Sequence, residues 1–135
     1  MNTTNIVSKI LELRTIAVVG MSPKSERPSH YVSLYMQKNG YQIIPVNPGH
    51  NEIVGLKSFP SLTDIPYRVD IVNVFRRSEY VMPIAEDAVK IGAKALWLQD
   101  GVISDDARQL AENAGLMVVM NDCLLRQHLR YFDHT

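Results

Sequence analysis

Short apolar runs recur along the sequence and have the pattern of buried strands. They are rich in branched side chains and are separated by turn-forming residues: 15–20 (TIAVVG), 42–46 (QIIPV), 70–75 (DIVNVF), 95–98 (ALWL) and 116–120 (LMVVM). Runs that are apolar on both faces are typical of a parallel sheet covered by helices. The pattern therefore predicts a sheet that is buried on both sides.

Amphipathic segments fit between these runs and predict helices over residues 5–13, 30–39, 78–91, 104–113 and 122–131. Ser104 followed by two aspartates suits a helix start, because a hydroxyl caps the first turn and carboxylates favour its positive end. The alternation predicts a single-domain α/β, Rossmann-like doubly wound sheet. We expect five parallel strands in the order 3-2-1-4-5 with helices on both faces. The long link 47–69 is expected to hold a short strand and a helical turn.

Composition narrows the class of protein. The 135 residues predict one domain over 1–135, and the 14 Lys and Arg balance the 14 Asp and Glu, which argues against a general nucleic-acid-binding protein. A single cysteine excludes an internal disulfide and makes the reducing cytoplasm the expected location. There is no signal-peptide pattern and no apolar run of about 18 residues, so no membrane association is expected.

Cations are expected to meet at the carboxyl edge of the sheet. Ligands of open α/β sheets bind there, near the switch point, which the order 3-2-1-4-5 places between strands one and four. The segments after strands one and three carry Lys24, Arg27, Arg76 and Arg77. Such a cluster beside a helix N-terminus predicts an anion site, and phosphate is the anion that suits it best.

Two common nucleotide motifs are absent. The Walker A pattern fails because Ser25 stands where its second glycine belongs, and GxGxxG fails because the glycine after Gly20 is Gly40. The second strand ends in Val46 and Asn47, without the acidic residue that binds a ribose hydroxyl. ATP, GTP, NAD and FAD are therefore disfavoured as ligands.

Five stretches carry a resemblance to a known family: VVGMSPKSERPSHYV (18–32), GYQIIPVNPGHNEIVGLKSFPSLTDIP (40–66), VDIVNVFRRSE (69–79), IGAKALWLQDGV (91–102) and AGLMVVMNDCLLR (114–126). Together they cover almost the whole chain. The sequence resembles the small stand-alone CoA-binding proteins, which are related to the CoA-binding domain of the succinyl-CoA synthetase alpha subunit. One departure is Asn121-Asp122-Cys123, where relatives more often have Asp-Arg-Cys, so one cation expected near the fifth strand is missing.

The resemblance implies a Rossmann-like domain that binds coenzyme A. It implies that the first loop holds the phosphates, that the end of strand two lies against the adenosine, that residues 75–77 wall the nucleotide, and that the turn after strand four follows the pyrophosphate or pantetheine. The implied binding residues are Gly20, Met21, Ser22, Lys24, Arg27, Pro28, Ser29, Val46, Asn47, Pro48, Phe75, Arg76, Arg77, Gln99 and Gly101.

Catalytic and metal-binding patterns are absent, so no catalytic or metal-ligating residue is assigned. His30 suits phosphate binding and a structural role equally, whereas His128 and His134 are expected at the surface. Cys123 is either a buried inert thiol or a partner for the CoA thiol in a mixed disulfide.

The expected function is binding of CoA or an acyl-CoA without catalysis. The alternatives are a small NAD(P)- or acyl-CoA-dependent enzyme and a CoA-sensing regulatory subunit that acts on a partner enzyme. A protein partner or a homo-oligomer is left open.

Overall fold

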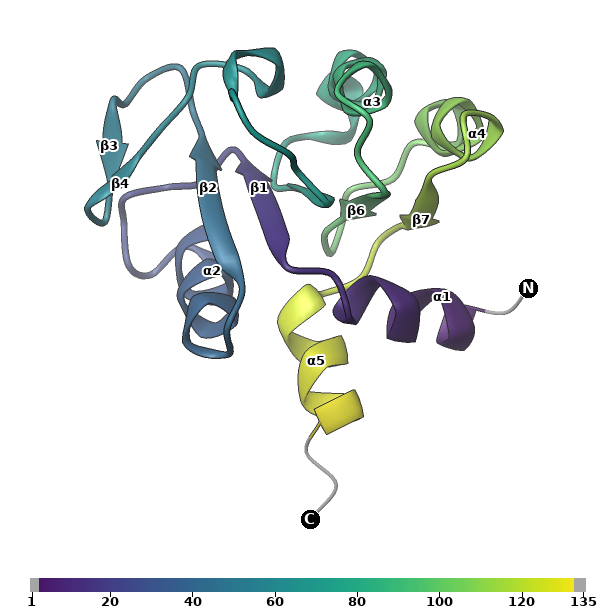
Figure 1. The fold of residues 1–135 in the computed structure, drawn as a ribbon, viewed down its shortest axis with the longest axis horizontal. Coiled ribbons are helices and arrows are strands. Elements are labelled where there is room, and N and C mark those ends of the chain that lie inside the picture. Colours follow the sequence, from purple (N-terminus) through teal and green to yellow (C-terminus); the bar gives the residue numbers. More distant parts are fainter. Residues whose placement is uncertain (1–2, 133–135) are drawn as a thin grey trace.

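A five-stranded parallel sheet forms the centre of the computed structural model, which describes residues 3–132 (Figure 1). Its strands are β1 (Thr15–Val19), β2 (Gln42–Val46), β5 (Ile71–Val74), β6 (Ala95–Leu98) and β7 (Met117–Val119). All five lie within the apolar runs of the sequence, so the predicted α/β class with a parallel sheet is confirmed.

Helices cover both faces of this sheet, as predicted (Figure 1). The helices α1, α2 and α5 lie on one side and α3 and α4 on the other, with bounds Thr3–Leu11, Pro28–Lys38, Leu124–Phe132, Val81–Lys90 and Asp105–Asn113. Successive strand residues alternate between the two layers, because side chains of a strand point to opposite faces. Thus Trp97 belongs to the core under α1, α2 and α5, whereas Leu96 and Leu98 belong to the core under α3 and α4.

The strand order differs from the prediction. The sheet runs β2-β1-β5-β6-β7, which is 2-1-3-4-5 for the five long strands, so the order 3-2-1-4-5 was wrong. All four residues of β5 are buried, as suits a strand between two neighbours rather than an edge strand. The place beyond β2 is taken by Phe59 of the following link, which forms a parallel bridge with Val46. The switch point therefore lies between β1 and β5.

The link between β2 and β5 holds the expected helical turn, and it holds two short strands where one was expected. It forms a small antiparallel pair, β3 (Glu52–Ile53) with β4 (Leu56–Lys57), and then the 3-10 turn η1 (Leu62–Asp64). Phe59 and Leu62 are buried in the core under α3 and α4, so their apolar side chains anchor this long connection.

The predicted helix start at Ser104 is confirmed, because its hydroxyl accepts a hydrogen bond from the amide of Ala107 at 3.2 Å. The helix predicted over 78–91 is divided into a 3-10 turn, η2 (Ser78–Tyr80), and α3. Ser78 does not cap it. Its hydroxyl instead accepts a hydrogen bond from the amide of Ile103 at 2.9 Å, which ties this turn to the segment after β6.

His128 is buried rather than exposed, contrary to the expectation, while His134 lies outside the described residues. His128 follows Leu124 by four positions, so both face the core side of α5. The rings of Tyr35, Tyr41 and Phe132 surround it at centroid distances of 5.3, 5.7 and 4.6 Å. Burial lowers the pKa of the His128 imidazole.

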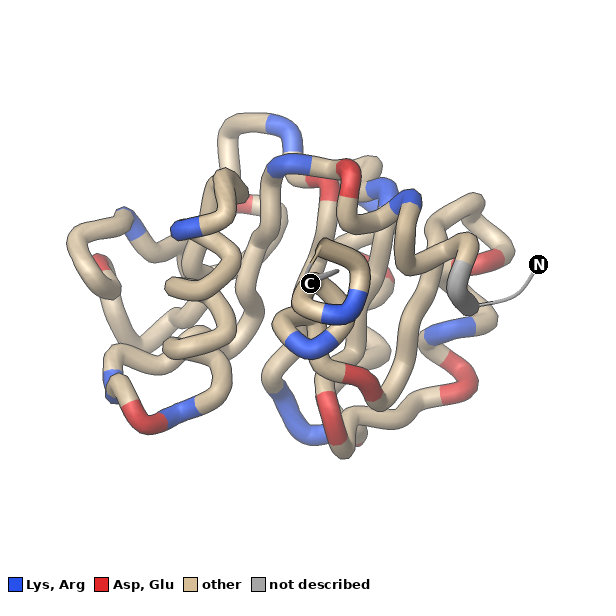
Figure 2. Tube along the Cα trace, turned by 90° about the horizontal axis from the view of Figure 1, so that it is seen from below, with Lys and Arg blue, Asp and Glu red and all other residues tan. Residues whose placement is uncertain are grey.

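Charged residues of both signs are spread along the trace, without a large region of one sign (Figure 2). Among the described residues, no helix combines the length and the apolar character needed to cross a membrane.

Candidate functional site

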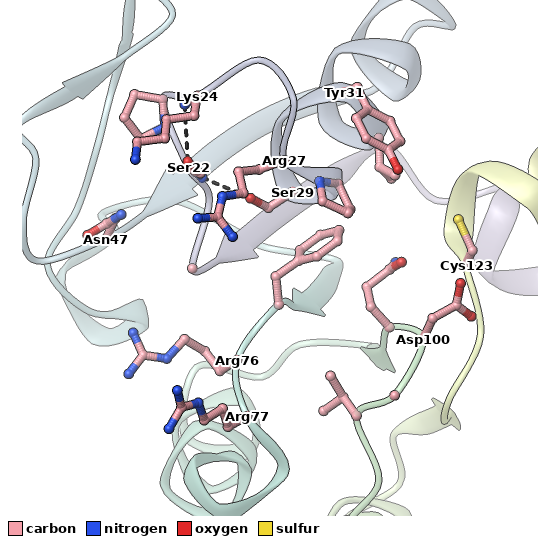
Figure 3. Close-up of a pocket in the computed structure, with 18 of the residues that line it drawn as sticks. Ser22, Lys24, Arg27, Ser29, Tyr31, Asn47, Arg76, Arg77, Asp100 and Cys123 are labelled. Carbon is pink, nitrogen blue, oxygen red and sulfur yellow. Dashed lines mark hydrogen bonds between the residues drawn. The ribbon is translucent and has the colours of Figure 1, made fainter.

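A pocket of about 720 Å³ opens at the carboxyl edge of the sheet, beside the switch point between β1 and β5 (Figure 3). The segments after all five strands contribute to it, together with the first turn of α2. Its lining is Gly20, Ser22, Pro23, Lys24, Arg27, Pro28, Ser29, Tyr31, Val32, Asn47, His50, Phe75, Arg76, Arg77, Gln99, Asp100, Gly101, Val102 and Cys123.

The four predicted cations come together at one end of this pocket. Lys24 and Arg27 come from the loop after β1, and Arg76 and Arg77 from the segment after β5 (Figure 3). None of them has a carboxylate within ion-pair distance among residues 3–132. The Arg76 guanidinium lies 5.3 Å from the centre of the Tyr80 ring, which limits where it can point.

The loop after β1 is held by its own polar groups. The amide of Ser22 donates to the Ser29 hydroxyl at 2.9 Å, and the amide of Lys24 donates to the Ser22 hydroxyl at 3.1 Å. His30 is buried outside the pocket lining, and its Nδ1 lies 2.9 Å from the Ser22 carbonyl oxygen. In this structure His30 therefore supports the loop.

The first turn of α2 carries no carboxylate. Arg27 is the N-cap residue, its side chain makes no capping hydrogen bond, and the first turn contains no acidic residue. The helix dipole therefore adds to the positive potential of the cation cluster.

Position 20 requires a glycine, because the segments after β1 and β5 approach each other closely there. Its φ is +87°, and a Cβ at this position would lie 2.6 Å from the carbonyl oxygen of Phe75. Only glycine combines this backbone conformation with so close a contact. The neighbouring strand end therefore already uses the space beside Gly20, a residue that the family resemblance implies as part of the phosphate-binding loop.

Three predicted site residues do not line the pocket. Met21 is fully buried, Val46 is buried in β2, and Pro48 is exposed outside the pocket. Asn47 connects two loops, since its Nδ2 donates to the Met21 carbonyl and its Oδ1 accepts from the Gly49 amide, both at 2.9 Å. The other twelve predicted residues are part of the lining.

The predicted set missed several lining residues. Tyr31 and Val32 follow Pro28 by one helical turn, so helix periodicity alone signals that they share its side of α2. Asp100 lies between the predicted residues Gln99 and Gly101. The remaining members are Pro23, His50, Val102 and Cys123. Cys123 was singled out in the sequence as either an inert thiol or a partner for the CoA thiol, whereas Pro23 and Val102 carry no pattern that separates them from other loop residues.

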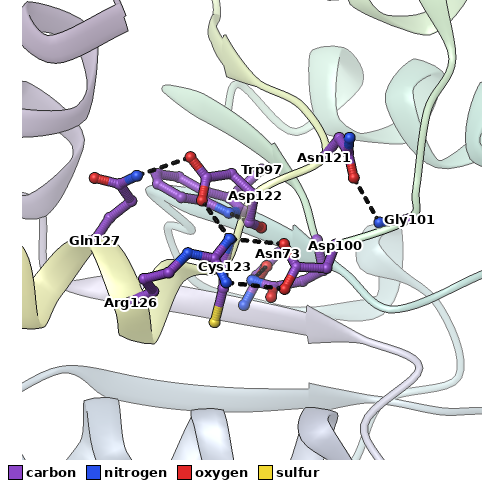
Figure 4. A network of polar contacts seen from close by, with 10 residues as sticks. Asn73, Trp97, Asp100, Gly101, Asn121, Asp122, Cys123, Arg126 and Gln127 are labelled. Carbon is purple, nitrogen blue, oxygen red and sulfur yellow. Dashed lines mark hydrogen bonds and ion pairs between the residues drawn. The ribbon is translucent and has the colours of Figure 1, made fainter.

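Asp100 is the one carboxylate of the lining, and Arg126 neutralises it (Figure 4). The guanidinium donates to both oxygens of Asp100, at 3.1 and 2.8 Å, and to Oδ1 of Asp122 at 2.8 Å. The hydrogen bonds from Arg126 lower the pKa of the Asp100 carboxyl. Arg126 thus brings a cation to the turn after β7, where the family resemblance had led us to expect an arginine in place of Asp122.

Asn121 joins the turns after β6 and β7. It has a left-handed backbone with φ of +58°, which asparagine tolerates better than most residues, and its Oδ1 accepts a hydrogen bond from the Gly101 amide at 2.7 Å. This bond fixes the two turns to each other at the edge of the pocket. Within the described residues, no three His, Cys, Asp or Glu side chains gather as metal ligands would.

Comparison with known proteins connects this site to a family. The model of the CoA binding domain matches residues 14–128, which include all the pocket residues. The chain belongs to the CoA-binding domain family. A stand-alone relative, the "uncharacterized protein YneT" of Bacillus subtilis (strain 168), is 44% identical over 115 residues, with 85% of each chain covered.

The chain is similar both to a solved protein of comparable length and to part of a longer ligase. A hypothetical protein from Pyrococcus horikoshii OT3 superposes with a TM-score of 0.92 at 38% identity, covering 96% of this chain and 92% of that one. The acetate–CoA ligase (ADP-forming) II of Archaeoglobus fulgidus is 28% identical over 101 residues, which are 73% of this chain and 15% of the ligase. This chain is therefore homologous to the CoA-binding domain of an ADP-forming ligase.

Proposed function

We propose that this chain binds CoA or an acyl-CoA in the pocket at the carboxyl edge of the sheet. The observation that carries the proposal is the cluster of Lys24, Arg27, Arg76 and Arg77, which lack carboxylate partners among the described residues. CoA brings a pyrophosphate and a 3′-phosphate, so it supplies the negative charge that this cluster lacks. The family of the chain and the position of the pocket at the switch point support the same ligand.

The pocket fits a long ligand with one charged end. Its cationic end is separate from the end formed by Tyr31, Asp100 and Cys123 (Figure 3). CoA has the matching division between a charged nucleotide and an uncharged arm. The end of β2 carries Asn47 instead of an acidic residue. This disfavours NAD, because a carboxylate there binds the free 2′,3′-diol of its adenosine ribose, and it suits CoA, because a carboxylate would repel the 3′-phosphate.

Isothermal titration under reducing conditions with CoA, dephospho-CoA and NAD tests this proposal. CoA should bind most tightly, and loss of the 3′-phosphate should weaken binding by about 10- to 100-fold, the value of one charge-assisted contact. NAD that bound as tightly as CoA would contradict the proposal.

The proposed role is binding rather than catalysis. Incubation with acetyl-CoA, followed by chromatography of the products, separates the two. Acetyl-CoA should stay intact, whereas turnover that is lost in Cys123→Ser would assign an acyl-CoA-dependent enzyme. A pull-down from cell extract with and without CoA distinguishes a regulatory subunit, which would retain a partner only in one of the two conditions.

A further inference from the structure

The end of the pocket away from the cations contains the chain's single thiol. Cys123 is half-buried and lines the pocket, on the same side as Tyr31 and Asp100 (Figure 3). Four cations at the other end suit the phosphates of a CoA-type ligand. A ligand bound in this direction extends its uncharged arm toward Cys123.

The position of Cys123 is fixed by its neighbours (Figure 4). Its amide donates to Oδ1 of Asp122 at 2.7 Å, and its carbonyl accepts from the Gln127 amide at 3.1 Å. The Trp97 indole donates to the Asp122 carbonyl at 2.9 Å, and Arg126 binds the Asp122 carboxylate. These bonds hold the start of α5 against the sheet, so the thiol stays at the pocket.

The carboxamide of Asn73 is a second, independent sign of a ligand at this end. Asn73 is fully buried, and its Nδ2 has no hydrogen-bond partner among residues 3–132, which costs about 1–3 kcal/mol for a buried donor. It stands opposite Trp97 in the sheet, and Trp97 contacts Asp122, the neighbour of Cys123. Its Oδ1 accepts from Nε2 of Gln99 at 2.8 Å, and Gln99 lines the pocket. The free donor of Asn73 therefore lies in the buried layer directly behind the lining residue Gln99.

Gln99 adds an acceptor at the same place. Its Nε2 is occupied by Asn73, which leaves its Oε1 to accept a hydrogen bond from a ligand. A pantetheine arm carries both amide N–H and C=O groups. It can therefore donate to Gln99 while its terminal sulfur reaches the neighbourhood of Cys123.

We propose that Cys123 is a thiol–disulfide exchange site that forms a mixed disulfide with CoA bound in this pocket. This inference depends on the proposed function. It specifies that the end of the pocket near Cys123 accepts CoA whose sulfur carries no acyl group. An S-acyl group would occupy the space in which the two sulfurs meet.

The exchange needs CoA disulfide as the co-reactant. The Cys123 thiolate attacks one sulfur of CoA disulfide, the S–S bond of CoA disulfide breaks, and an S–S bond between Cys123 and one CoA forms. The second CoA leaves as a thiolate and takes up the proton that Cys123 released. A free thiol such as a second CoA reverses the step, so the modification is reversible.

The test is intact-protein mass spectrometry of the full chain incubated with CoA disulfide, with the disulfide of pantetheine as the comparison. The expected product is heavier by one CoA less two hydrogens, is absent in Cys123→Ser, and is reversed by dithiothreitol. Binding of the nucleotide end raises the local concentration of the disulfide, so CoA disulfide should react at least about tenfold faster than the disulfide of pantetheine. Adenosine 3′,5′-bisphosphate should remove this advantage, because it competes for the cationic end without carrying an arm.

Peptide mapping of the wild-type adduct locates the modified residue independently of the Cys123→Ser variant. Equal rates with the two disulfides, or no effect of adenosine 3′,5′-bisphosphate, would show an accessible thiol without a site and would overturn the inference. Calorimetric binding of CoA under reducing conditions, with no adduct from CoA disulfide, would overturn it and leave the proposed function standing. Absence of CoA binding in the calorimeter would overturn both.

Discussion

The two ends of the pocket use arginine in opposite ways. At the cationic end, Arg27, Arg76 and Arg77 have no carboxylate partner among the described residues. At the end near Cys123, Arg126 is bound to Asp100 and Asp122 and thereby connects the turn after β6 with the turn after β7. The difference shows that positive charge alone does not mark a binding site, because a guanidinium that is already paired has little left to offer an anion.

Removing the free arginines should produce the largest effect. We expect the double variant Arg76→Ala/Arg77→Ala to bind CoA about 100-fold more weakly or worse, because each charge-assisted contact contributes about 1.5–3 kcal/mol. Isothermal titration measures the loss. Arg68→Ala is the matched control, since Arg68 is exposed and precedes β5 at the opposite edge of the sheet. A similar loss in both variants would show that overall charge, rather than the pocket, determines affinity.

Gly20→Ala should lower the free energy of unfolding of the protein by about 2 kcal/mol or more, because a strained φ adds to a collision with the Phe75 carbonyl. Gly115→Ala is the control for the backbone term, since Gly115 also has a positive φ but nothing lies within 4 Å of its added Cβ. It should cost about 1 kcal/mol. Urea unfolding measures both values, and equal losses would show that the close approach at Gly20 has no energetic consequence.

Replacing His128, which does not line the pocket, should have a smaller effect on the free energy of unfolding. Burial lowers its pKa in the folded protein, so protons bind the unfolded chain preferentially once the pH falls below the ordinary histidine pKa of about 6.5. Stability should be complete above that value and should decrease as the pH falls toward the folded pKa. Urea unfolding from about pH 7.5 to 5.5 should show a weaker pH dependence in His128→Gln than in the wild type. An identical dependence would assign the proton uptake to other groups.

Loss of the ion pair between Asp100 and Arg126 should have the smallest effect on the free energy of unfolding. Asp100→Asn should cost about 0.5 kcal/mol at neutral pH, because exposed ion pairs contribute little. The lowered pKa of Asp100 means that its contribution is present above the ordinary value of 3.8 and is lost as the pH falls through the folded pKa. Variant and wild type should therefore converge in acid, which urea unfolding across this range measures. A difference that persisted in acid would point to packing rather than to the ion pair.

The positions of the strands could be predicted because each strand is a short apolar run that is recognisable from neighbouring residues alone. Runs such as 71–74 are apolar on both faces, and only burial between two layers of helices accommodates them. Strand order could not be predicted in the same way. It depended on the link after β2, where Phe59 pairs beside Val46 and blocks the position assigned to β5.

The candidate site was partly predictable for a related reason. Residues directly after strands must lie at the carboxyl edge, so Arg27, Arg76 and Arg77 were placed there from the sequence alone. Met21 failed this reasoning, since its position in the loop was right but its side chain turns into the core. Long-range contacts decide such orientations.

The apolar periodicity and the cations that follow the strands were determined by the amino-acid sequence, because both follow from positions close together in the chain. The tertiary structure decided which cations remain free and which are paired, since Arg126 meets Asp100 only when the start of α5 lies next to the turn after β6. It also decided that Cys123 shares a pocket with the basic loops. Both results depend on distances between segments that are far apart in the sequence, and no local pattern contains those distances.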